Sequence, residues 1–204
     1  MDRDAVPRGE DDVTIQDCWK RAREAFGTSF VFEKRSQRLA TFLRVLGFMG
    51  LVVPVVIGGL VGGFGIGFGA LPVAVTIGAA IAVLQAVFSL WSLAATWVES
   101  YAYAIESMVE NRNLYAKFKE LAESSPNSAV ELQLRYEILK AEDKARREQD
   151  LRRGIKPHET RLGMRAGLRE LGQTCVACGV QPYSMESTAC SVCGSFDRKS
   201  RSKK

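Results

Sequence analysis

Four of the five cysteines lie near the C-terminus, in two Cys-x-x-Cys pairs separated by eleven residues. The first pair is Cys175 and Cys178, the second is Cys190 and Cys193, and each is followed directly by glycine. Such a turn aims two thiolates and nearby backbone amides at one point, and four thiolates are the ligands of a closed, tetrahedral Zn²⁺ site. The spacing therefore predicts a structural Zn²⁺ site, with an iron site as the alternative.

The cysteine pattern also bears on the cellular compartment. Paired Cys-x-x-Cys motifs in a reducing compartment indicate metal binding, whereas a secreted scaffold spreads its cysteines along the chain. The segment around them has few apolar residues, so metal binding should supply most of its folding free energy. A basic tail follows, which is either a solvated end or part of a surface for an acidic partner: Arg198, Lys199, Arg201, Lys203 and Lys204.

We expect no enzyme and no small-molecule substrate. A four-thiolate site leaves no open position for an activated water. The sequence also has no phosphate-binding loop and no nucleophile paired with a base. Its one histidine, His158, is expected in a loop. The net charge of +5 and pI near 9.0 suit an anionic membrane surface and nucleic acid equally.

Upstream of the cysteines, the chain is dominated by one stretch without Asp, Glu, Lys or Arg, from Val45 to Val98. Two membrane-spanning helices of about 20 residues each with a tight connection need this length. The glycines between Gly62 and Gly69, followed by Pro72, should form the connection. The sequence predicts a hairpin with helices near residues 40–61 and 72–98. A hairpin buried in a soluble core is the alternative, but 204 residues offer little protein to enclose it.

Basic residues flank both outer ends of this hairpin and are missing from its tip. The bias of Lys and Arg toward the cytoplasmic side predicts that both termini are cytoplasmic. Aromatic residues gather where the second span would leave the bilayer: Trp91, Trp97, Tyr101 and Tyr103.

Two overlapping Gly-x-x-x-Gly pairs end the first span, Gly58 with Gly62 and Gly59 with Gly63. Small residues at this spacing let membrane helices approach closely. The pairs favour tight helix packing, either within one hairpin or between copies of the chain in a homo-oligomer.

The flanking segments are predicted to be helical. A helix should start at Thr14, bury Cys18 and end at Gly27, and the second span should continue unbroken to Ser124. A further helix should run from a capping box at Ser128 and Glu131 to Gly154. We expect its residues Val130, Leu134, Ile138 and Leu139 to pack on Leu114, Phe118 and Leu121, and its acid–base pairs four apart to lie on a solvated face.

Together these features predict an all-α membrane protein: a two-helix transmembrane hairpin with a long cytoplasmic helical extension and a small C-terminal zinc ribbon. The expected divisions are an N-terminal cytoplasmic amphipathic helix (1–38), the hairpin (39–98), the helical extension (99–158) and the zinc ribbon with its basic tail (159–204).

This order of elements, with the spacing of Cys175, Cys178, Cys190 and Cys193, resembles the bacterial mobilome CxxCx(11)CxxC proteins, which look like members of the SLATT group of two-helix membrane proteins. The resemblance implies a place in the bacterial inner membrane and a role in mobile-element or anti-phage conflict systems. It further implies oligomers that perturb the membrane after a sensor protein partner is triggered. The alternative is a membrane-tethered zinc ribbon that binds nucleic acid or a protein partner.

Overall fold

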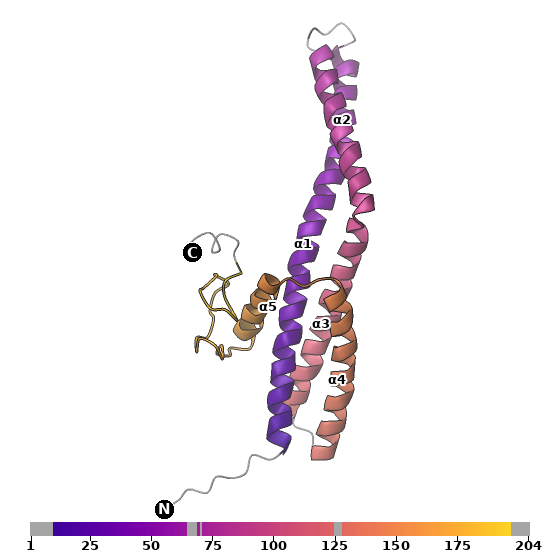
Figure 1. Ribbon diagram of the computed structural model, residues 1–204. Helices are drawn as coiled ribbons and strands as arrows, with labels where there is room; N and C mark the ends of the chain where they lie inside the picture. Colours follow the sequence, from indigo (N-terminus) through magenta and orange to yellow (C-terminus); the bar gives the residue numbers. More distant parts are fainter. Residues whose placement is uncertain (1–9, 65–68, 70, 125–127, 197–204) are drawn as a thin grey trace, which may run out of the picture. The chain divides into compact units, whose positions relative to one another are not determined.

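A computed structural model describes residues 10–64, 69, 71–124 and 128–196. This part of the chain forms five helices and no strand: α1 (Glu10–Phe64), α2 (Leu71–Ala94), α3 (Trp97–Ser124), α4 (Ala129–Arg152) and α5 (Pro157–Glu170). The all-helical prediction is confirmed. The chain divides into two compact units, Met1–Lys34 with Ile105–Lys204, and Arg35–Ala104. Helix α1 contributes residues to both units (Figure 1).

The first unit is a bundle of three helices, formed by the start of α1, most of α3 and α4. Each helix buries one stripe whose members alternate three and four residues apart, the spacing that keeps one face toward its partners. On α1 the stripe runs from Cys18 through Ala22 and Ala25 to Phe32. The stripes of the other two helices are Ser107, Asn111, Leu114, Phe118 and Leu121 on α3, and Leu132, Tyr136, the half-buried Leu139, Asp143, Arg146 and Asp150 on α4.

The apolar core of this bundle lies toward the beginning of α1. Cys18 and Ala22 pack there with Leu114 and Phe118 of α3 and with Tyr136 of α4. Cys18 is fully buried, as the sequence predicted, and burial raises the pKa of its thiol to about 11. Small residues on α1 let the other two helices approach its axis, while the aromatic rings of Phe118 and Tyr136 meet edge to face, 6.4 Å apart.

The face of α4 that enters the bundle differs from the predicted one. Val130, Leu134 and Ile138 were expected in the core but are exposed, whereas Leu132 and Tyr136 are buried. The fourth expected residue, Leu139, is half-buried and packs on this core. The difference arises because the buried stripe continues beyond Tyr136 through charged residues that are satisfied by partners on other helices. A prediction based on the largest apolar side chains selects the opposite face.

Two helix boundaries also differ from the prediction. Gly27 does not end the first helix, which continues to Phe64. The glycine at this position has another role: its missing side chain leaves room for the backbone of α5. The second span does not run unbroken to Ser124: α2 ends at Ala94 and α3 starts at Trp97. Between them Thr96 takes a positive φ of 49°. Threonine rarely adopts this conformation, so nothing in the sequence indicated a helix break at this residue.

The ends of α4 lie close to where the sequence placed them. Ser128 is the N-cap residue, but its side chain makes no capping hydrogen bond, so the predicted capping box is absent. At the other end Gly154 has a φ of 65°, the left-handed conformation that glycine adopts easily after a helix.

The second unit contains the later part of α1 together with α2 and the start of α3. Gln85 of α2 donates a hydrogen bond to the carbonyl oxygen of Leu46 in α1, at 3.4 Å. The rings of Phe42 in α1 and Trp97 in α3 contact each other at a tilt of 46°, with 6.1 Å between their centroids. The first contact joins α2 to α1, and the second joins the start of α3 to α1.

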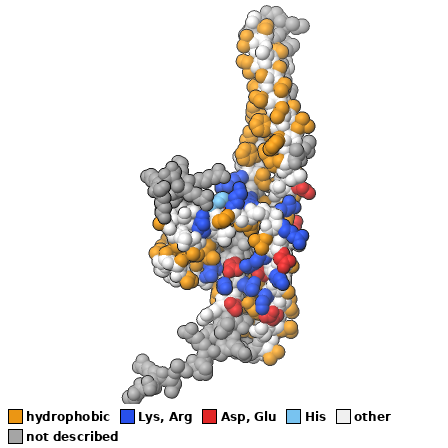
Figure 2. Space-filling view, viewed as in Figure 1, with side chains coloured by type: hydrophobic (Ala, Val, Ile, Leu, Met, Phe, Trp, Pro, Cys, Tyr) orange, Lys and Arg blue, Asp and Glu red, His pale blue; other side chains and the backbone are white. Residues whose placement is uncertain are grey.

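Most apolar side chains of this second unit are exposed, among them Phe48, Leu51, Val55, Val83, Phe88 and Leu90. Hydrophobic side chains cover the surface where α2 lies, whereas charged ones gather over the helices of the first unit (Figure 2). Among the described residues one helical stretch, Ile15–Val53, is long and apolar enough to cross a membrane, and the apolar stretch of α2, Val75–Trp91, is shorter. By length and composition, the described residues therefore contain one candidate membrane span, whereas the sequence predicted two.

Candidate metal centre

The four cysteines lie on two loops that follow α5. The first loop turns at Cys175, where the amide of Gly179 donates to the carbonyl oxygen of Cys175 at 2.7 Å. The second repeats this turn, with the amide of Gly194 donating to the carbonyl oxygen of Cys190 at 3.0 Å. Gly179 has a φ of 69°, which favours glycine. The amide of the glycine after each cysteine pair therefore closes the turn.

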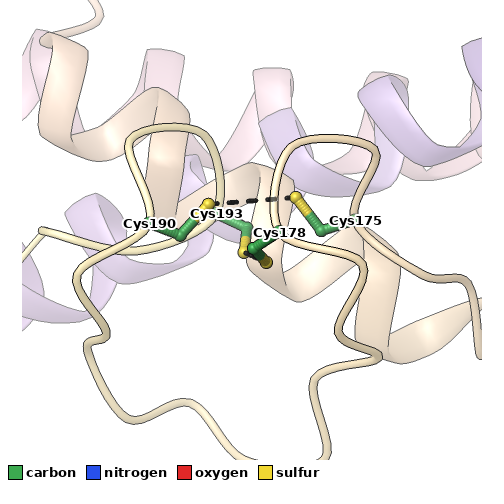
Figure 3. Close-up of side chains that lie close together, drawn as sticks. All are labelled: Cys175, Cys178, Cys190 and Cys193. Atoms are coloured by element: carbon green, nitrogen blue, oxygen red, sulfur yellow. Dashed lines mark hydrogen bonds between the residues drawn. The ribbon is translucent and has the colours of Figure 1, made fainter.

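The two turns bring all four thiols to one point, as Figure 3 shows. Their Sγ atoms all lie within 4.8 Å of one another. Cys175 and Cys190 are 4.0 Å apart at Sγ, and Cys178 and Cys193 are 3.8 Å apart. Sulfurs bound at about 2.3 Å around a tetrahedral ion are separated by about 3.8 Å, whereas a disulfide needs about 2.05 Å. The set has the dimensions of a four-thiolate metal site, and these residues could hold a metal ion.

The environments of the four thiols are unequal. Cys175 and Cys193 are buried against Leu168 of α5, while Cys178 is exposed. The backbone amides of Cys193 and Val192 lower the pKa of the Cys190 thiol to about 6. Burial, followed by the thiol of Cys175, raises the pKa of Cys193. The cluster thus has a buried side, which faces α5, and an open side.

Helix α5 supplies a platform that the sequence did not predict. His158 was placed in a loop, but it lies in the first turn of α5. Arg165, buried on this helix, donates from Nε to the carbonyl oxygen of Ser184 at 2.8 Å and from Nη1 to that of Cys193 at 3.5 Å. Arg161 donates to the carbonyl oxygen of Ser195 at 3.2 Å. Two arginines therefore tie the second cysteine loop, and the segment that joins the two loops, to the helix.

A signal for this helix is present in the sequence. Arg161, Met164, Arg165 and Leu168 recur three and four residues apart, on one side of a helix that starts at a proline. Gly163 and Gly167, four apart, lie on the side that meets α1. This spacing, and not the cysteine motif, is the feature of the sequence that indicates α5.

The glycines predicted to pack helices are open. Gly58, Gly59, Gly62 and Gly63 are exposed, and a Cβ built on any of them would meet nothing within 4 Å. Gly50 differs, because its Cβ would contact the side chain of Gln85. The Gly-x-x-x-Gly pairs are therefore not used for packing between the described helices of one chain.

A second cluster of polar side chains lies inside the three-helix bundle. Asp150 is 1 % exposed, and its two carboxylate oxygens accept hydrogen bonds from Ser107 and Asn111, each at 2.7 Å. Arg146 reaches the same carboxylate at 3.4 Å and Glu106 at 2.8 Å. These interactions join α3 to α4 and leave the carboxylate fully bonded.

A neighbouring cavity of about 300 Å³ lies between α1, α4 and α5. Three of its charged lining residues pair with one another, since Arg147 contacts Glu24 at 2.7 Å and Asp143 at 3.4 Å. Of the acid–base pairs four apart on α4, Glu131 with Arg135 lies on a solvated face, as the sequence predicted. Asp143 and Arg147 differ from the prediction, because they also contact Arg21 and Glu24 of α1.

The fold and the cysteine cluster define a class: over the described residues, a bundle of helices followed by a four-cysteine module that could hold a metal ion. The sequence model of the family described as Mobilome CxxCx(11)CxxC protein matches residues 15–196, which is most of the chain. The chain belongs to this family, and the resemblance drawn from the cysteine spacing is confirmed. No curated protein and no solved structure matches it.

Proposed function

We propose that this protein is a membrane-perturbing effector of a mobile-element or anti-phage conflict system. In this proposal the second unit crosses the bacterial inner membrane as a two-helix hairpin and assembles with other copies into a homo-oligomer. The protein performs no enzymatic reaction. The four cysteines bind one structural Zn²⁺ that keeps the C-terminal module folded.

One observation carries the proposal: the uncharged stretch from Val45 to Val98 exposes its large apolar side chains. Leu51 and Val55 are each 72 % exposed, and Leu90 is 68 % exposed. Contiguous apolar surface of this kind is rare on monomeric soluble proteins and marks a surface that meets a membrane or another protein. A bilayer would cover both helices at once, and within it all backbone hydrogen bonds of a helix are satisfied internally.

The expected orientation follows from the basic residues outside the uncharged stretch. Lys34, Arg35 and Arg38 precede it and Arg112 and Lys117 follow it, which favours a cytoplasmic location for both termini. The cysteine module would then lie in a reducing compartment, where thiolates stay available for Zn²⁺. The resemblance to SLATT proteins supports a sensor protein partner as the trigger.

The alternative is a membrane-tethered module whose ribbon binds nucleic acid or a protein partner. Its support is the apolar surface of the cysteine loops, where Val176 is 96 % exposed and Tyr183 is 80 % exposed. Exposed aromatic and aliphatic side chains suit a protein partner better than a phosphate backbone, which is contacted mainly by cations.

The test is to express the full chain in bacteria and follow the membrane potential with a voltage-sensitive dye. The wild-type protein should enter the membrane fraction and depolarise the cells. Val55→Arg with Val83→Arg places two charges in the uncharged stretch, each costing about 2.5–3.5 kcal/mol at a bilayer centre. This variant should fail to insert and leave the potential unchanged.

Val176→Arg is the matched control, because it makes the same change at an exposed residue outside the hairpin. It should depolarise cells as the wild type does. A wild-type chain that inserts without changing the potential would support the tether instead. Depolarisation by the non-inserting double variant would contradict the membrane role.

A further inference from the structure

Gln85 is the one carboxamide side chain in the uncharged stretch from Val45 to Val98. It lies within the apolar stretch of α2, Val75–Trp91, and is half-buried. Its Nε2 donates to the carbonyl oxygen of Leu46 at 3.4 Å, beyond the range of about 2.7–3.2 Å that is typical of N–H···O bonds. Among the described residues this is its only hydrogen bond, so its carboxamide oxygen has no donor there.

This carboxamide is unfavourable inside a bilayer unless it finds a further partner. Lipid tails offer neither donors nor acceptors, so a polar group without a partner is costly in the hydrocarbon region. Asn and Gln side chains of membrane helices form hydrogen bonds to a neighbouring helix instead. The described part of the chain gives Gln85 an acceptor, the oxygen of Leu46, but no donor. The missing donor therefore has to come from outside the chain.

A second copy of this chain supplies such a donor at the required depth. A carboxamide has both an acceptor and donors, so two carboxamides can exchange two N–H···O bonds with each other. Two identical side chains meet in this way when the two copies are related by a twofold axis. An axis along the bilayer normal keeps both hairpins in the same orientation, and the two Gln85 side chains then lie at equal depth.

One flank of α2 leaves Gln85 within reach of another helix. Ala79, Ala82 and Ala86 follow one another three and four residues apart beside Gln85, and all three are exposed. Their small side chains allow a helix to approach closely enough for a hydrogen bond between side chains. The far side of α2 carries large apolar side chains that are 59–68 % exposed, which suit lipid: Val83, Val87 and Leu90.

The contact between Gln85 and α1 depends on Gly50. A Cβ at this position would contact the carboxamide nitrogen of Gln85, so the side chain lies there because residue 50 has none. The end of a glutamine side chain turns easily, and the hydrogen bond that it gives up is long. The carboxamide can therefore exchange this contact for a better one between two copies.

We infer that Gln85 is the hydrogen-bonding contact between copies of this chain in the membrane: two Gln85 carboxamides pair across a twofold axis, and the flanks that carry Ala82 pack on each other. The inference rests on the proposed function, because it requires the hairpin to lie in the bilayer. It adds to that function the side chain and the helix face through which the copies meet.

The test is disulfide cross-linking of the full chain in isolated bacterial membranes. Chains with Ala82→Cys are oxidised mildly, and the linked dimers are measured on non-reducing gels. The unsubstituted protein gives the background from the chain's own cysteines. Val87→Cys is the matched control, because it places the same group at an exposed position on the far side of α2. We expect cross-linking above the background for Ala82→Cys and not for Val87→Cys.

Gln85→Leu, added to Ala82→Cys, removes the carboxamide and leaves an apolar side chain. It should lower the cross-linked fraction at least about threefold, because the hydrogen bonds between the copies are lost. The membrane fraction should not change, since leucine is favourable in the bilayer. Thr76→Val is the matched control, because the Thr76 hydroxyl already donates to the carbonyl oxygen of Pro72 within α2, at 2.8 Å. It should leave the cross-linked fraction unchanged.

Gly50→Ala separates the contact between copies from the contact within the hairpin. The new methyl group displaces Gln85 from Leu46 but keeps its carboxamide, so the cross-linked fraction should stay the same or rise. An equal loss in Gly50→Ala and Gln85→Leu would show that only the contact within one hairpin matters, and would overturn the inference.

Other results also decide the question. In protein that has entered the membrane, three outcomes contradict the pairing of Gln85: background cross-linking of Ala82→Cys, preferential cross-linking of Val87→Cys, or unchanged cross-linking in Gln85→Leu. The membrane role itself would then still stand. A chain that is absent from the membrane fraction would contradict the proposed function, and this inference with it, so the two failures are distinguishable.

Discussion

Gly27 of α1 and Gly163 of α5 contact each other through their backbones. A Cβ on Gly163 would lie 2.6 Å from the carbonyl oxygen of Gly27, and a Cβ on Gly27 would lie 2.6 Å from that of Gly163. Gly167, one turn later, approaches the backbone of Arg23 equally closely. The cysteine module is thus attached to the bundle through a helix crossing that only glycine permits.

Replacing Gly163 should loosen this attachment. In Gly163→Ala the new methyl group would meet backbone atoms that cannot turn aside, so we expect a loss of about 1–3 kcal/mol in the free energy of unfolding. Thermal unfolding of the detergent-solubilised protein would measure it. Gly47→Ala is the control, because nothing lies within 4 Å of that position and alanine suits a helix interior. Equal stability of the two variants would contradict the crossing.

Arg165 should fix the cysteine loops to α5. In Arg165→Ala the carbonyl oxygens of Ser184 and Cys193 lose this donor. Ser184 is exposed, so water can replace the donor there, whereas Cys193 is buried, and leaving a buried group unsatisfied costs about 1–3 kcal/mol. We expect limited proteolysis to cut between residues 173 and 196 several times faster than in the wild type. Arg169→Ala removes an exposed arginine from the same helix and should leave the rate unchanged. Identical cleavage of both variants would show that Arg165 does not hold the loops.

The metal can be tested by its content in the purified protein. We expect about one Zn²⁺ per chain, because four thiolates satisfy its tetrahedral geometry. Cys190→Ser should lose the metal and become sensitive to protease in the C-terminal module. Cys18→Ala, in the bundle core, should retain the metal. Elemental analysis measures both, and an unchanged metal content in Cys190→Ser would exclude the site.

The buried carboxylate of Asp150 should be important for the stability of the bundle. Asp150→Ala leaves Ser107, Asn111 and Arg146 without their common partner, so we expect a loss of about 3 kcal/mol. Glu131→Ala breaks an exposed ion pair with Arg135 and should cost less than about 1 kcal/mol. Denaturant unfolding followed by circular dichroism compares the two, and equal midpoints would contradict a structural role for Asp150.

The sequence predicted most accurately the features that arise locally. The cysteine cluster depends on a spacing and on two glycines, and Cys18 lies in a short apolar stripe, so both were placed correctly. The end of α4 at Gly154 depends on one residue that adopts a left-handed conformation easily. Each of these features has its cause within a few residues along the chain.

The features that the sequence missed depend on contacts between distant segments. Asp143, Arg146 and Asp150 are buried because partners on α1 and α3 satisfy them, and no local pattern distinguishes them from a solvated face. Gly27 was predicted to end a helix, whereas the residue at this position must be glycine because α5 approaches the backbone of α1 there. The break at Thr96 has no local signal of any kind.

The last prediction concerns assembly in the membrane. Gly58, Gly59, Gly62 and Gly63 are open in the single chain, so their close-packing surface is available to another copy. Gly59→Leu with Gly63→Leu should push neighbouring helix axes apart and reduce the cross-linked oligomer. Insertion should persist, because leucine is favourable in the bilayer centre. Cross-linking in membranes, liposome leakage and membrane potential would be measured on the same samples.

Val55→Leu is the matched control, because it enlarges an exposed apolar side chain without filling a glycine surface. It should leave both the oligomer and the leakage unchanged. If the double glycine variant inserts, no longer cross-links and still depolarises cells, assembly through these glycines is not how the protein acts. If the double variant still cross-links and still depolarises cells, the glycines do not lie at an interface between copies. They are open within one chain, so two leucines there would then face only lipid.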